Sequence, residues 1–165
     1  MQTRPYLKPE LSTSDKMIEA AGWLCLVCLW IISLAGYDDL PEIIPTHFNE
    51  SMEVNDYGSK MTILVLPVIA TLAFLGLTEL NRHPHIFNFP VKITSENALY
   101  QYTNATRMLR CLKLIIAFVF GLAVLMIYQA ASGKTEKIGF WLMLVVLGVI
   151  ILPMGYFIIK AVKGK

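Results

Sequence analysis

The residues best suited to chemistry lie together between positions 40 and 60, in the string LPEIIPTHFNESMEVNDYGSK. His47 and the carboxylates of Glu50 and Glu53 offer nitrogen and oxygen donors that zinc or another divalent cation can use. Their spacing matches no established ligand motif, and no second histidine lies nearby. The alternative, which we favour, is structural: His47 and Asn49 would hydrogen-bond this loop onto the rest of the protein.

The other reactive side chains point to packing rather than to catalysis. His83 and His85 flank a proline, where they could bind a metal or simply pack. Cys25 and Cys28 resemble a CxxC motif, but they lie in a long apolar stretch, where a thiol is poorly reactive. The chain has no nucleophile–base arrangement, phosphate-binding glycine loop or HExxH motif. The sequence therefore implies no cofactor and favours a non-enzymatic role.

Long charge-free blocks determine the elements that must position these residues. The chain has 165 residues, is 56% hydrophobic and has a mean hydropathy of +0.58. About 20 apolar residues in a helix span a hydrocarbon core of roughly 30 Å, and only helices or closed barrels satisfy their backbone there. The blocks without Asp, Glu, Lys or Arg are Ala20–Tyr37, Met61–Thr78, Leu114–Ser132 and Ile138–Ile159. They predict an all-α integral membrane four-helix bundle, a single domain over 1–165 with spans near 18–37, 61–80, 112–132 and 138–160.

The distribution of basic residues predicts the orientation. Eleven Lys and Arg residues lie in the N-terminal segment, the middle segment and the C-terminal tail, against three in the two other loops. Because cytoplasmic loops carry the excess of Lys and Arg, both termini are expected inside. The loop 38–60 is then extracytoplasmic and the loop 81–111 cytoplasmic. The lipid bilayer is the expected partner, nucleic acid is not, and no particular oligomeric state is implied.

Two further patterns bear on the bundle. Asn97–Lys113 has apolar residues at helical spacing, with its basic residues elsewhere. It predicts either a helix on the membrane surface, with Arg107 and Arg110 at anionic headgroups or simply solvated, or an inward extension of the third span. Pro67 and Pro153 lie inside spans and predict kinks. No ionisable residue lies deep in a span, which argues against ion-coupled transport.

At the loop 40–60 the chain resembles the domain-of-unknown-function 1648 (DUF1648) family of bacterial membrane proteins. The resemblance rests on Leu40-Pro41, Ile44-Pro45-Thr46-His47-Phe48-Asn49 and Asp56-Tyr57-Gly58-Ser59-Lys60. The stretch from Glu96-Asn97 to Arg107 also resembles the family's segment before its third span, and NRHPHIFNFPVKIT resembles Bacteroidetes-type versions. Met52 stands where the family usually has glycine, and Asn55 where it has aspartate.

The resemblance implies a location and a role. The same domain forms the N-terminal half of SdpI-like proteins, which are longer and resemble immunity factors against a secreted peptide toxin. By this resemblance the chain is a multi-pass protein of the bacterial cytoplasmic (inner) membrane that binds a peptide toxin or signal through its extracytoplasmic His47–Lys60 loop. The implied binding residues are His47, Asn49, Asp56, Lys60 and Asn97. The alternatives are a metal-binding protein or metal-dependent membrane enzyme centred on His47, and a small-molecule transporter, which only the two prolines support.

Overall fold

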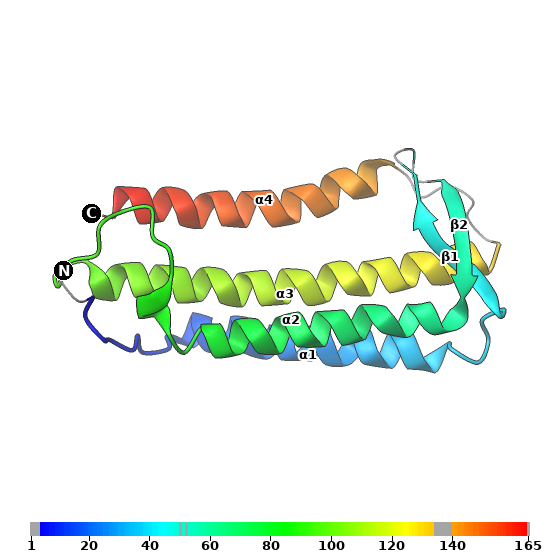
Figure 1. The fold of residues 1–165 in the computed structure, drawn as a ribbon, viewed down its shortest axis with the longest axis horizontal. Helices are drawn as coiled ribbons and strands as arrows, with labels where there is room; N and C mark the ends of the chain where they lie inside the picture. The colour runs from blue at the N-terminus through cyan, green and yellow to red at the C-terminus, as the bar shows by residue number, and fades with distance from the viewer. Residues whose placement is uncertain (1–3, 50, 52, 134–139, 165) are drawn as a thin grey trace.

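Four long helices lie side by side, and a small hairpin crosses one end of the bundle (Figure 1). The computed structural model describes residues 4–49, 51, 53–133 and 140–164, without the side chains of 140–142. Among these residues, four helices are long and apolar enough to cross a membrane. They are α1 (Thr13–Ala35), α2 (Val65–Leu80) with the preceding 3-10 turn η1 (Lys60–Leu64), α3 (Ala98–Ala131) and α4 (Phe140–Lys163). The prediction of a helical membrane protein with four spans is confirmed.

Helix α1 begins before the expected span 18–37 because a capping box fixes its first turn. The side chain of Ser12 accepts a hydrogen bond from the backbone of Asp15, and the Asp15 carboxylate accepts one from the backbone of Ser12. At the other end Gly36 lies against α3: a Cβ there would be 2.9 Å from the ring of Tyr128. The hydroxyl of Tyr128 donates to the carbonyl of Ser33, so α1 and α3 meet closely at this end.

The loop 38–60 contains an antiparallel hairpin that the sequence did not predict. Strand β1 (Ile43–Phe48) pairs with β2 (Val54–Ser59), with irregular register near residues 45–48. A two-stranded sheet tolerates Pro45 because every strand in it is an edge strand, where a missing N–H need not break a ladder.

Pro67 lies near the start of α2 rather than in the interior of the helix. It is the third residue of α2, where the helix changes from the 3-10 geometry of η1. Proline is well tolerated in the first turn of an α-helix, because its fixed φ suits the helix. The carbonyl of Pro67 accepts from Thr71, whose hydroxyl in turn accepts from the indole N–H of Trp30. Pro67 thus begins the helix and supports the contact between α1 and α2.

Helix α3 is the central element of the bundle, and its length decides between the two predictions for Asn97–Lys113. It runs unbroken for 34 residues from Ala98, so the segment is an inward extension of the third span. Helix α3 contacts each of the other three long helices, whereas α4 packs mainly on α3. Buried amides of α3 hold α4: Gln101 Nε2 donates to the carbonyls of Ala161 and Gly164, and Asn104 Nδ2 donates to that of Phe157.

Candidate functional site

The hairpin is fastened to the end of the bundle by a small apolar core. Leu40 and Ile44 are buried, and they belong to one cluster with Ile63 of η1 and Val124 of α3. The backbone N–H of Lys60 donates to the carbonyl of Glu42 at 3.0 Å, which closes the base of the hairpin. The hairpin is therefore a fixed projection of the bundle rather than a free loop.

Lys60 lies at this base and links the two strands through its side chain. Its ammonium is 3.0 Å from the carboxylate of Glu42 and 5.3 Å from the centre of the Tyr37 ring. The pair joins the residue before β1 to the residue after β2, and the cation–π contact adds the end of α1. The lysine side chain is only 18% exposed, so we interpret it as a structural residue of the site.

The outer surface of the hairpin mixes apolar and polar groups. Ile43 and Tyr57 are 66% and 61% exposed. His47, Asn55 and Asp56 are exposed beside them. Large side chains that stay exposed on a fastened element are candidates for contact with a partner.

His47 and Asn49 hydrogen-bond within the hairpin. Nδ1 of His47 lies 2.6 Å from Oδ1 of Asn55, the position at which the resemblance implies aspartate. Oδ1 of Asn49 accepts from the backbone of Ser51 and Glu53, which shapes the turn between the strands. No group of three potential metal ligands occurs among the described residues. Of the metal candidates, Glu50 lies outside those residues.

Asn97 lies at the opposite end of the molecule from the hairpin (Figure 1). Its Oδ1 accepts from the backbone of Thr94, and its Nδ2 donates to the carbonyl of Lys92. These bonds shape the turn that leads into α3. Asn97 and the residues of the hairpin therefore do not form one site.

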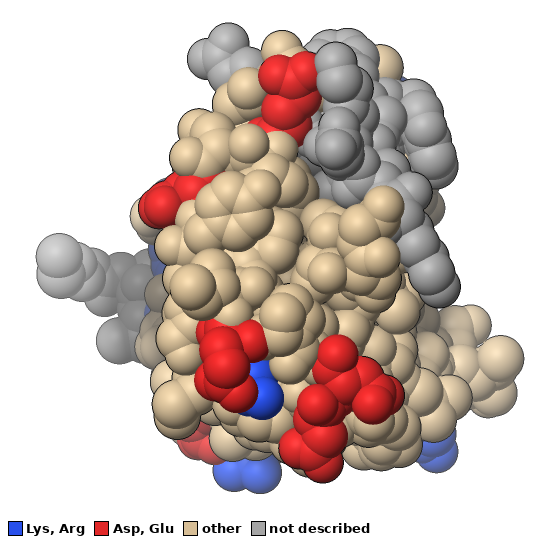
Figure 2. Space-filling view, turned by 90° about the vertical axis from the view of Figure 1, so that its right-hand side faces the viewer, with Lys and Arg blue, Asp and Glu red and all other residues tan. Residues whose placement is uncertain are grey.

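Acidic side chains surround the hairpin. Figure 2 shows carboxylates in several patches over this end of the molecule, with little basic surface between them. Asp38 and Asp39 follow α1, Glu42 precedes β1, and Asp56 lies in β2. Within the described part of the chain, no basic side chain pairs with Asp38, Asp39 or Asp56. The described residues at this end of the protein therefore present an excess of negative charge.

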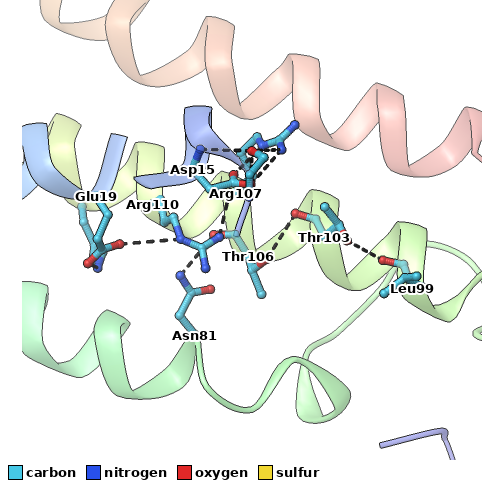
Figure 3. A network of polar contacts seen from close by, with 10 residues as sticks. Asp15, Glu19, Asn81, Leu99, Thr103, Thr106, Arg107 and Arg110 are labelled. Atoms are coloured by element: carbon cyan, nitrogen blue, oxygen red, sulfur yellow. Dashed lines mark hydrogen bonds and ion pairs between the residues drawn. The ribbon is translucent and has the colours of Figure 1, made fainter. Parts of the chain in front are cut away.

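At the other end, a buried network of charges was not foreseen from the sequence. Asp15 is 2% exposed and accepts from Arg107 Nε at 2.6 Å and from Arg107 Nη2 at 2.9 Å (Figure 3). Further along the same two helices, four residues on in α1 and six in α3, Glu19 accepts from Lys113 at 2.5 Å. The expectation that this basic segment faces headgroups or solvent is wrong for Arg107 and Lys113, because both pair with carboxylates of α1.

The spacing of these charges was a signal that could have revealed the network. Asp15 and Glu19 are four residues apart on α1, and Arg107, Arg110 and Lys113 are three apart on α3. Residues at such intervals share one face of a helix. Helices α1 and α3 run in the same direction, so the two faces match in register (Figure 1).

Comparisons with known proteins bear on the segment that contains the hairpin. Residues 24–71 match the family described as "Domain of unknown function (DUF1648)". The chain is also 27% identical over 139 residues to an uncharacterized protein of Archaeoglobus fulgidus, with 75% of this chain and 76% of the relative covered. No solved structure matches. The family match runs from the middle of α1 through the hairpin and into α2.

Proposed function

We propose, from the premise that residues 24–71 belong to the DUF1648 family, that this multi-pass membrane protein binds a peptide outside the cell through the β1–β2 hairpin. The observation that carries the proposal is the combination of a fastened base with an exposed, partly apolar surface. Ile44 is fully buried in the bundle, while its neighbour Ile43 and Tyr57 of β2 are exposed. Rigid elements that present large side chains bind partners at low entropic cost.

The charge at this end favours a cationic peptide. Asp38, Asp39 and Asp56 have no basic partner among the residues that the structure describes. Complementary charge speeds encounter and disfavours partners of the same sign. A ligand with Lys or Arg next to apolar residues would match both the acidic surroundings and the exposed Tyr57.

Strand addition is the binding mode that fits the hairpin best. Strand β2 is mostly exposed, and its main chain pairs on one side with β1. An extended peptide can add to such an edge through main-chain hydrogen bonds, while alternate side chains provide specificity. Tyr57 and Asp56 of β2 would then contact the apolar and basic residues of the peptide.

We further propose an orientation in the membrane and a cellular role for the protein. With both termini inside, the hairpin lies on the outer side of the bacterial cytoplasmic membrane, where a secreted peptide reaches it. An SdpI-like role follows: the protein protects its cell from the peptide or reports the presence of the peptide.

The binding test uses the full chain in lipid nanodiscs and a fluorescent synthetic peptide of alternating lysine and valine. We expect Tyr57→Ala to weaken binding by about tenfold or more, because an exposed tyrosine at the centre of a contact surface often contributes over 1.4 kcal/mol. Asp56→Asn should weaken binding further and reduce its dependence on salt. The matched control is Tyr156→Ala, which removes a tyrosine of α4 that is 59% exposed.

A cellular test addresses the role. Cells that lack the protein should become more sensitive to a membrane-active cationic peptide, and wild-type protein but not Tyr57→Ala should restore resistance. Equal binding by wild type and Tyr57→Ala, together with unchanged sensitivity across a broad panel of such peptides, would refute the proposal.

A further inference from the structure

A cavity of about 260 Å³ lies between the ends of α1, α2 and α3 that are remote from the hairpin. Its charged lining consists of three basic residues, Arg82, Arg110 and Lys113, and one acidic residue, Glu19. A water molecule occupies roughly 30 Å³ in the liquid, so the cavity has room for a phosphate group. The lining has a surplus of positive charge.

Most charges around the cavity are already matched. Nζ of Lys113 donates to Glu19 and to Thr78 Oγ1, and it lies 4.5 Å from the centre of the Phe74 ring. Arg82 is paired with Glu79 at 2.8 Å and is largely exposed. Arg107 donates hydrogen bonds to both carboxylate oxygens of Asp15. These groups have little capacity left for a ligand.

Arg110 differs from the others. Its side chain is 11% exposed and lies 3.7 Å from Glu19 and 4.0 Å from Asp15. Figure 3 shows the guanidinium between these carboxylates, both of which accept from other cations. The guanidinium makes no hydrogen bond to any residue that the structure describes. A guanidinium has five N–H donors, and leaving them unmet away from water is costly.

The position of Arg110 along α3 indicates what could meet those donors. It precedes the charge-free block that begins at Leu114 by four residues, or about 6 Å along a helix axis. If the hydrocarbon core begins at Leu114, this distance places Arg110 at the level of the phosphate groups of a bilayer. The planar guanidinium matches two oxygens of a phosphate at once, which an ammonium cannot do.

We infer that this cavity is a binding site for a phosphate-bearing anion, with Arg110 as the residue that binds the phosphate oxygens. Asp15 and Glu19 hold the guanidinium in place without saturating it. The ligand is the phosphate of an anionic lipid headgroup or a soluble phosphate compound. The site is independent of the hairpin and of any peptide bound there.

The experiment measures thermal unfolding of the full chain in uncharged detergent. One arm titrates inorganic phosphate against chloride at constant ionic strength, and a second adds phosphatidylglycerol against phosphatidylcholine. We expect one ligand to raise the midpoint in a saturable manner, with an affinity about tenfold weaker in R110Q, because that variant loses the charged donors that would bind the phosphate oxygens. R110K should be intermediate, since it keeps the charge but loses the planar donors.

The controls separate the outcomes. Lys163→Gln removes one positive charge from the end of α4 and should leave the response unchanged. A response to inorganic phosphate identifies a soluble ligand, and a response to phosphatidylglycerol alone identifies a headgroup. Should R110Q fail to fold, R110K and phospholipid retention by the wild type in native mass spectrometry give the same test. The inference is overturned if the wild type responds to neither ligand, or if the arginine variants respond as the wild type does.

Discussion

Asp15 is the residue on which the charge network depends most. It is buried, caps α1 through Ser12 and accepts two hydrogen bonds from Arg107. Asp15→Asn keeps the shape but removes the charge, so Arg107 stays partly buried without a counter-charge. We expect the free energy of unfolding to fall by about 3 kcal/mol, as for other broken buried ion pairs. Thermal unfolding in detergent measures the change, with the exposed Glu10→Gln as control; equal midpoints would contradict the pairing.

At the level of single residues, the sequence indicated which side chains form hydrogen bonds better than it indicated their partners. His47 and Asn49 were expected to hydrogen-bond the loop onto the rest of the protein, but their partners are Asn55, Ser51 and Glu53 within the hairpin. These partners depend on strand register, which composition does not determine. Arg110 looked like any basic residue of the cytoplasmic loop, because its burial arises only when α1 packs on α3.

Gly58 tests the hairpin as an element. A Cβ at this position would lie 2.9 Å from Cγ2 of Thr46, which is tighter than real contacts allow. We expect Gly58→Ala to destabilise the hairpin by about 1–3 kcal/mol through overpacking. Faster hydrogen exchange of the β1 and β2 amides would report this. Thr46→Ser removes the methyl group but keeps the hydroxyl, so the double variant should recover slow exchange. Continued fast exchange in the double variant would show that the contact is not the cause.

The sequence predicted the helices well and the hairpin not at all, for a physical reason. A span must be long, apolar and uncharged, so Ala20–Tyr37 is visible without any knowledge of its neighbours. Strand β1 is short, contains Pro45 and buries the adjacent residues Ile44 and Pro45, so it lacks the alternation that marks a strand. The start of α3 was ambiguous because a surface helix and an inward extension have the same apolar periodicity.

For the whole molecule, the charge network affects the count of basic residues from which the orientation is predicted. Three of the eleven basic residues on the side of the termini, Arg107, Arg110 and Lys113, lie in the network with Asp15 and Glu19. Removing them from the count leaves eight against three. Both termini are still expected inside, because the remaining excess lies near the ends of the helices and acidic residues contribute little to the rule.

Cysteine labelling tests this orientation and, with it, the placement of the hairpin. In a chain whose three native cysteines are replaced by serine, Tyr57→Cys places a thiol on the exposed surface of β2, and Tyr6→Cys places one near the N-terminus. A membrane-impermeant maleimide should label position 57 in intact cells and position 6 only after permeabilisation. The reverse pattern would move the acidic hairpin inside, where no secreted peptide reaches it, and would move the Arg110 cavity to the outer surface. The peptide proposal would then be refuted, whereas phosphate binding by the purified protein would not change. The two proposals can therefore be refuted independently of each other.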